Sequence, residues 1–177
     1  NASYDDANSQ LNESSGQFAL AYTAIENANL AIAGLRKYGN VENNAGMRYL
    51  LGEALVLRAL YYHDLVKAWG DVPARFQPIG ETGDVIKPKN DRDVIYRQII
   101  SDLEEAVNYV YWPNESGKTG LTTRVNKAFA YGLLARVCLS AAGYSQRPDE
   151  GQIGPGNVGQ NRRSRLNESG QAWGDGA

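Results

Sequence analysis

The chain has 177 residues, of which 42% are hydrophobic and 21% are charged, a composition typical of globular domains rather than of disordered segments. Its formal net charge is −2, so no general electrostatic attraction to nucleic acid or to an anionic membrane is expected. A single cysteine and a single histidine exclude an intrachain disulfide and a zinc site built from these residue types.

A 3.6-residue hydrophobic period predicts the first helix over about residues 16–38 and the second over about residues 45–69. The second helix runs into the sequence Gly-Asp-Val-Pro. Because Gly70 suits a left-handed backbone and Pro73 keeps Val72 extended, this helix is expected to end there. Its apolar residues form two adjacent stripes, so it needs packing partners on more than one side.

The third predicted helix covers about residues 91–110, and the fourth covers about residues 125–142. The second helix aligns in sequence with the fourth, and the first aligns with the third. Two similar helical hairpins, joined by a longer connection over residues 70–90, are typical of a tetratricopeptide-like arrangement. The predicted fold class is therefore all-α, with tetratricopeptide-like helical hairpins and long irregular loops.

The helical pattern divides the chain into three parts. Residues 1–15 are expected to form an N-terminal loop segment, and residues 16–142 are expected to form the two hairpins of one domain. Residues 143–177 are rich in glycine and are expected to form a loop that leads to a missing C-terminal part. No apolar run reaches the roughly 18 residues of a membrane span. Since the sequence starts at Asn1, we expect a processed or partial chain.

Two arginines lie in the middle of predicted helices, among leucines and alanines: Arg58 and Arg136. A guanidinium in such a place is expected to be buried and paired, because an isolated buried charge is too costly. Asp102, Glu105 and Glu26 are the available carboxylates, and Asp102 is the preferred partner of Arg58. A structural role is favoured over ligand binding for both arginines.

No catalytic constellation is recognisable in the sequence. His63 has neither a second histidine at metal-binding spacing nor a nucleophile in a known motif beside it, so a packing role is favoured. Glu104 and Glu105 are adjacent on a helix and point in different directions, which is poor geometry for an acid–base pair. Cys138 lies in an apolar helical run and is expected to pack as a small hydrophobe. We therefore predict no enzyme activity, no cofactor and no metal.

Aromatic residues in irregular segments are the remaining functional signal. Trp112 follows the third helix beside a polar turn, and Asn114 is close enough in sequence to donate a hydrogen bond next to it. Tyr4 and Trp173 lie near the chain ends, where segments are often mobile. These four residues are the predicted ligand contacts, because exposed aromatic rings stack on sugars or peptides. The alternative for Trp112, that it anchors its loop to the core, stays open.

Four spaced motifs resemble those of one protein family. The string GEALVLRALYYHDLVKAWGDVP closely resembles the signature helix of SusD/RagB proteins, and AYTAIENANLAI resembles the helix before it. The strings VIYRQIISDLEEAV and GLTTRVNKAFAYGLLARVCLSAAGY resemble the next two helices in family order. The resemblance covers about residues 16–144. Trp112 and Cys138 depart from it, since a leucine and an aromatic residue are usual there.

The resemblance implies a function as well as a fold. SusD/RagB proteins are outer-membrane lipoproteins of Bacteroidota in which a tetratricopeptide-like scaffold holds variable ligand-binding loops. On the extracellular face they bind glycans, or in some cases peptides, and act as a lid on a SusC-like TonB-dependent transporter. By this resemblance the chain is expected to belong to a carbohydrate-binding lipoprotein of nutrient uptake, whose N-terminal lipid anchor is absent from this sequence.

Other readings are kept beside the glycan-binding one. The alternatives are a peptide binder of the same family and a helical-repeat scaffold whose partner is another protein. A glycosidase is disfavoured, because no two carboxylates at catalytic spacing are recognisable. The residues that match the family are scaffold residues, so the resemblance names a class of protein without locating its binding site.

Overall fold

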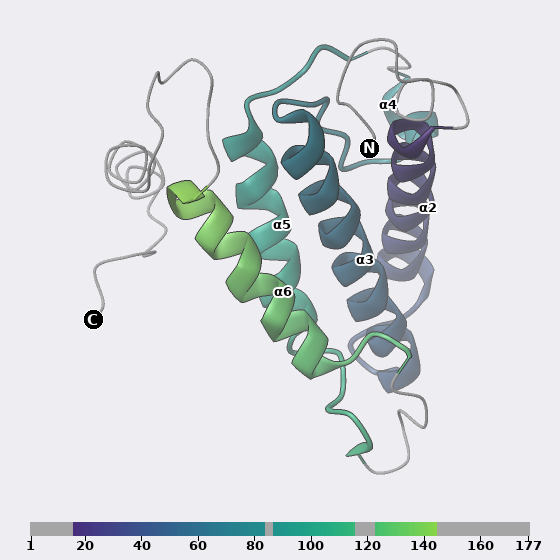
Figure 1. The fold of residues 1–177 in the computed structure, drawn as a ribbon. Helices are drawn as coiled ribbons and strands as arrows, with labels where there is room; N and C mark the ends of the chain where they lie inside the picture. Colours follow the sequence, from purple (N-terminus) through teal and green to yellow (C-terminus); the bar gives the residue numbers. More distant parts are fainter. Residues whose placement is uncertain (1–15, 84–86, 116–122, 145–177) are drawn as a thin grey trace.

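The structure, a computed structural model, describes residues 16–83, 87–115 and 123–144. Four long helices lie side by side in it, each antiparallel to the one before (Figure 1). Along the chain, a short helix comes after the second long helix and before the third. A π-helical turn, Ser140–Tyr144, follows the fourth. The helices are α2 (Gln17–Tyr38), α3 (Ala45–Trp69), α4 (Ile79–Thr82), α5 (Arg92–Ala106) and α6 (Lys127–Leu139). The predicted all-α fold of helical hairpins is confirmed.

The ends of the long helices are set by local sequence. Asn44, Asp91 and Asn126 are the N-caps of α3, α5 and α6, and each side chain accepts a hydrogen bond from a backbone N–H at 2.8–3.1 Å. Such caps satisfy donors that the first turn leaves without a helical partner. At the end of α3, Gly70 has a φ of +75°, so the predicted helix stop at this glycine is confirmed.

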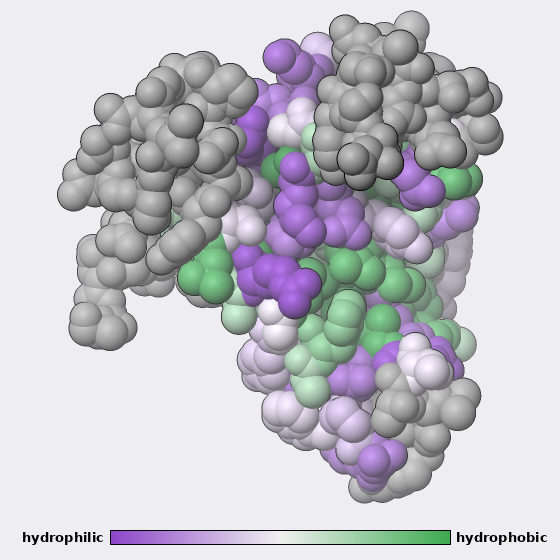
Figure 2. Space-filling view, in the orientation of Figure 1, coloured by the Kyte–Doolittle hydropathy of each residue, from purple (hydrophilic) through white to green (hydrophobic). Residues whose placement is uncertain are grey.

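Helix α3 is the centre of the domain. It packs on α2 on one side and on α5 on the other, and α6 packs mainly on α5. Leu51, Leu55 and Tyr62 on one of its predicted stripes are fully buried. Leu50 and Leu57 on the other stripe are exposed. Figure 2 shows that hydrophobic residues gather over the middle of one face of the molecule. The prediction of partners on more than one side is confirmed, although the buried arc is narrower than the sequence suggested.

Gly52 lets α3 approach the turn after α5 closely. A Cβ added at Gly52 would lie 2.8 Å from Cγ1 of Val110 and 3.0 Å from Cβ of Tyr109. Atoms at this distance overlap, so the neighbouring side chains would have to shift. Gly34 in α2 differs, because no atom outside the adjacent backbone of its own helix lies within 4 Å of a Cβ added there.

We expect Gly52→Ala to lower the free energy of unfolding by roughly 1 kcal/mol. Overpacking costs about 1–3 kcal/mol, and the better helix propensity of alanine offsets about 1 kcal/mol of that. Gly34→Ala is the matched control and should be stabilising by about 0.5–1 kcal/mol, because it gains propensity without a clash. Urea unfolding of the two variants measures the difference. Equal stability of both would contradict the close approach.

The connection after α3 packs across α2 and α3. The hydroxyl of Tyr62 accepts a hydrogen bond from the N–H of Arg75 (2.6 Å) and donates one to its carbonyl oxygen (2.7 Å). Asn29 of α2 donates to the same carbonyl at 3.0 Å, and Tyr22 donates to the carbonyl oxygen of Pro73 at 2.7 Å. These bonds hold residues 73–79, called here the crossover segment, against the two helices.

Arg58 joins three helices and the crossover segment. It is only 3% exposed, and its Nε and Nη2 donate to the two carboxylate oxygens of Asp102 at 2.8 Å each. Its Nη1 donates to Asn29 Oδ1 at 2.9 Å and to the carbonyl oxygen of Phe76 at 3.1 Å. The predicted burial of Arg58 and its pairing with Asp102 are confirmed.

The same expectation was wrong for Arg136, whose side chain is exposed. The sequence surroundings of Arg58 and Arg136 are alike, but their surroundings in space are not. Helix α3 has a helix on each side, whereas α6 packs mainly on α5. Buried residues of α6 such as Leu133 and Val137 face that neighbour, and Arg136 lies on the solvent side.

Candidate functional site

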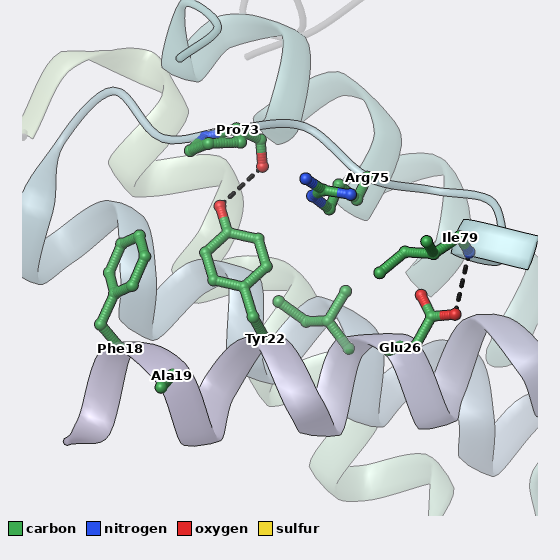
Figure 3. Close-up of a pocket in the computed structure, with 8 residues that line it drawn as sticks. Phe18, Ala19, Tyr22, Glu26, Pro73, Arg75 and Ile79 are labelled. Atoms are coloured by element: carbon green, nitrogen blue, oxygen red, sulfur yellow. Dashed lines mark hydrogen bonds between the residues drawn. The ribbon is translucent and has the colours of Figure 1, made fainter. Parts of the chain in front are cut away.

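A pocket of about 360 Å³ lies between α2 and the crossover segment (Figure 3). This volume is in the range of pockets that bind small molecules. Helix α2 contributes Phe18, Ala19, Tyr22, Ile25 and Glu26. The crossover segment contributes Pro73, Arg75 and Ile79. Most of the lining is therefore apolar or aromatic, with one carboxylate and one guanidinium.

Glu26 is the polar group of the pocket that can accept a further hydrogen bond. Its Oε1 accepts from the N–H of Ile79 at 2.9 Å, which fixes the carboxylate at the start of α4. Its Oε2 is buried and has no hydrogen-bond partner among the described residues. A buried polar atom without a partner is unusual in folded proteins and calls for an explanation. Figure 3 shows the guanidinium of Arg75 on the crossover side of the same pocket.

Two aromatic rings form the end of the pocket nearest the start of α2. The ring centroids of Phe18 and Tyr22 are 4.9 Å apart, and Phe18 also packs edge-on against Trp69 at 5.3 Å. Burial, and to a lesser extent the nearby Tyr62, raises the pKa of Tyr22 above its ordinary value. The Tyr22 hydroxyl therefore stays protonated and keeps its hydrogen bond to the crossover segment.

The predicted ligand residue Trp112 lies at the opposite end of the helices, in the turn after α5 (Figure 1). It is 49% exposed, and its ring stacks on that of Tyr131, which is 47% exposed (centroids 5.9 Å apart, 26° between the planes). The ammonium of Lys127 lies 6.0 Å from the Trp112 ring centroid. Trp112 and Tyr131 together are called here the aromatic platform.

Backbone contacts hold the aromatic platform in place. The N–H of Lys127 donates to the carbonyl oxygen of Tyr111 at 2.7 Å, which joins the start of α6 to the residue before Trp112. The N–H of Trp112 donates to a carboxylate oxygen of Glu115 at 2.8 Å. Tyr111 in turn stacks on Tyr49 of α3, with centroids 5.2 Å apart. A ring fixed in this way loses little conformational entropy when a ligand binds.

The other predicted contacts have different outcomes. Asn114 is exposed in the same turn as Trp112 and has a φ of +63°, a left-handed conformation that asparagine tolerates better than most residues. Tyr4 and Trp173 lie outside the described residues, as do most of the predicted end segments 1–15 and 143–177. None of these ligand assignments is tested by the geometry, so they stay predictions.

The sequence marks neither the pocket nor Tyr131, the second half of the aromatic platform. In the sequence, Glu26 stands out only as a possible partner for Arg58, and Arg75 and Tyr131 belong to no recognisable pattern. These residues are brought to Tyr22 and Trp112 by helix packing, so no short motif marks them.

His63 and Cys138 have packing roles, as predicted. His63 is buried, with Nε2 3.2 Å from Oγ of Ser140. Cys138 packs against the core, and burial raises the pKa of its thiol to about 12, so it stays in the unreactive protonated form. Among the described residues, no group of three or more metal-ligating side chains is found, and no helix is long and apolar enough to cross a membrane.

We expect His63 to make the fold less stable in mild acid. Burial lowers the pKa of His63 below the 6.5 of an unperturbed histidine, with a smaller effect of Lys67 in the same direction. The unfolded chain therefore takes up the proton first, and the free energy of unfolding falls as the pH drops below about 6.5. Melting temperatures at pH 7.5 and 5.5 measure this loss. It should be smaller in His63→Asn, and an equal loss in both proteins would contradict the assignment.

These features define a helical scaffold with a preformed pocket at one end and an aromatic platform at the other. Residues 1–139 match a family model of SusD-like proteins that is described as starch-binding and associating with the outer membrane. The chain belongs to the SusD-like family. The family is described by what its members bind and not by a reaction, which agrees with the expectation that the chain is not an enzyme.

Individual relatives agree with the family match. The chain is 34% identical over 86 residues to the SusD-like protein P38 of Formosa agariphila, covering 48% of this chain and 16% of that protein. A SusD superfamily structure from Parabacteroides distasonis superposes with a TM-score of 0.63 at 29% identity, over 86% of this chain and 31% of that one.

A glycan-binding protein is also among the similar structures. Surface glycan-binding protein A from Bacteroides fluxus has a TM-score of 0.59 at 28% identity, over 71% of this chain and 25% of that one. The chain thus spans between 16% and 31% of the lengths of these relatives.

Proposed function

We propose that this chain is part of a cell-surface protein that captures oligosaccharides at the outer membrane and passes them to a SusC-like TonB-dependent transporter. The observation that carries the proposal is the match of residues 1–139 to a starch-binding, outer-membrane-associated family. We infer that the protein works on the extracellular face and is held there by an N-terminal lipid anchor.

The similar solved structures support a glycan as the ligand. One is a laminarin-binding SusD-like protein, at 26% identity and a TM-score of 0.59. Another, surface glycan-binding protein A from Bacteroides thetaiotaomicron, is in complex with laminarihexaose, at 25% identity and a TM-score of 0.55. The ligands of these two proteins favour a carbohydrate over a peptide or a protein partner as the ligand of this chain.

The aromatic platform supports the same proposal. Sugars present C–H groups on the faces of their rings, and these pack on exposed aromatic faces. Trp112 and Tyr131 are each about half exposed (49% and 47%), and they are held by the turn after α5 and by α6. Lys127 beside them and Asn114 in the same turn as Trp112 offer donors to the hydroxyls of a sugar. We propose this platform as the part of the glycan site that residues 87–144 contribute.

Binding of the full-length protein to polysaccharides tests the proposal. We expect at least one of three polysaccharides to retard the protein in an affinity gel: starch, laminarin or xyloglucan. We expect titration calorimetry to detect no binding of a panel of peptides. Retention by none of the polysaccharides together with peptide binding would overturn the proposal in favour of a peptide binder. Transfer to the transporter is tested by co-purification with a tagged SusC-like transporter from the same cells. Failure of that step alone would remove the transporter and leave glycan binding.

A further inference from the structure

We propose that the pocket between α2 and the crossover segment is a second sugar-binding subsite, which holds one pyranose ring through Glu26, Arg75 and the rings of Phe18 and Tyr22. This inference rests on the proposed function in that it takes the ligand to be a glycan. It places a contact at the opposite end of the helices from Trp112 and the rest of the aromatic platform.

The unpartnered oxygen of Glu26 indicates that the pocket receives a hydrogen-bond donor. The other oxygen is already used by the N–H of Ile79, at 2.9 Å. Oε2 is buried and has no partner among the described residues, so a ligand that enters the pocket and brings a donor would satisfy it. A hydroxyl group can serve as that donor.

The combination of charges favours a neutral ligand over a cationic one. Glu26 alone would attract an ammonium group, but Arg75 lines the same pocket and carries the opposite charge. A carboxylate and a guanidinium together offer an acceptor and a donor to one molecule without a net charge. Neighbouring hydroxyls of a sugar match this pair, since each hydroxyl both donates and accepts.

The remaining lining matches the other surface of a sugar. The rings of Phe18 and Tyr22 stand at 53° to each other, so they form an apolar corner at one end of the pocket. Ile25, Pro73 and Ile79 extend this apolar surface. The axial C–H groups of a pyranose ring pack against such a surface, while its equatorial hydroxyls point outward to the polar pair.

The two walls of the pocket are joined before any ligand arrives. Tyr22 bonds to Pro73, Glu26 bonds to Ile79, and Asn29 bonds to the carbonyl of Arg75, at 2.7, 2.9 and 3.0 Å. The backbone of Arg75 is fixed further by the hydroxyl of Tyr62, which bonds to both its N–H and its carbonyl oxygen. A pocket that is already formed pays less ordering entropy on binding.

Saturation-transfer NMR on the full-length protein tests the subsite, with the methyl pyranosides of glucose, galactose, mannose and xylose as probes. At least one glycoside should receive saturation from the wild-type protein. Glu26→Gln should weaken its binding about tenfold, because the glutamine oxygen can keep the bond to Ile79 while the amide presents a donor to the pocket. Phe18→Leu should lower the saturation of the sugar's ring protons. Glu104→Gln, which makes the same charge change at an exposed site on α5, should bind like the wild type.

The other results count against the subsite or against the proposed function, and they tell the two apart. If no glycoside receives saturation, or if Glu26→Gln and Phe18→Leu bind as the wild type does while melting at its temperature, the pocket is not a sugar subsite. Nα-acetyl-lysine methyl ester, whose side-chain ammonium is free, probes for a cation site. If this compound binds and Glu26→Gln abolishes its binding, while no glycoside binds, the pocket is a cation site instead. Retention of the wild-type protein by a polysaccharide, without glycoside binding in the pocket, would overturn the subsite alone. Glycoside binding in the pocket without polysaccharide retention would overturn the proposed function alone.

Discussion

Arg58→Ala is expected to lower the free energy of unfolding by about 3–5 kcal/mol, because it leaves the carboxylate of Asp102 buried without its counter-charge. Asp102 is 2% exposed, and besides Arg58 it has Gln98 Nε2 as a donor, at 2.9 Å. The same substitution removes the donors to Asn29 and to the carbonyl of Phe76, so the crossover segment loses one of its attachments. Chemical denaturation of the variant and its parent measures the loss.

The exposed pair of Arg36 and Glu105 provides a control of the same chemistry. Its Nη2–Oε2 distance is 2.7 Å, comparable with the buried pair, but Arg36 is solvent-exposed. Arg36→Ala should therefore cost about 1 kcal/mol or less. The double variant in which Arg58 becomes Met and Asp102 becomes Leu should recover much of the loss, since it leaves no unpaired charge. An Arg58→Ala protein as stable as Arg36→Ala would refute the role given to this buried pair.

Trp112→Ala is expected to weaken glycan binding about thirtyfold, which corresponds to about 2 kcal/mol, a typical cost of removing a central aromatic contact from an interface. The expectation follows from the exposed half of the ring and from its fixed stacking on Tyr131. Isothermal titration of the full-length protein, with an oligosaccharide of the polysaccharide that retards it in the gel, measures the change. Tyr38→Ala is the matched control, because Tyr38 is 76% exposed at the C-terminal end of α2 and belongs to no proposed site.

The melting temperature of the same variant separates the two readings of Trp112. A weakened affinity with an unchanged melting temperature would assign the ring to the ligand. An unchanged dissociation constant with a lower melting temperature would make Trp112 an anchor that holds the turn after α5 to α6 through Tyr131. If neither quantity changes, both readings are wrong.

The sequence by itself determined the helices, the points where they end and one of their buried charges. Hydrophobic periodicity depends only on which residues share a face of one helix, so it can be read without knowing the partners. The stop at Gly70 depends on backbone conformation at a single residue, and the structure shows the positive φ there. The pairing of Arg58 followed from the cost of burying a charge, and Asp102 was the carboxylate in reach.

Tertiary packing alone decided which of two similar arginines is buried and where cavities form. Arg58 and Arg136 have the same kind of neighbours in sequence, but α3 is packed on both sides and α6 mainly on one, so only Arg58 is buried. The pocket joins Glu26 to Ile79, and the aromatic platform joins Trp112 to Tyr131. Such contacts depend on how whole helices and the crossover segment lie against one another. Local sequence patterns specify the face that each element buries, and they do not specify the element that covers it.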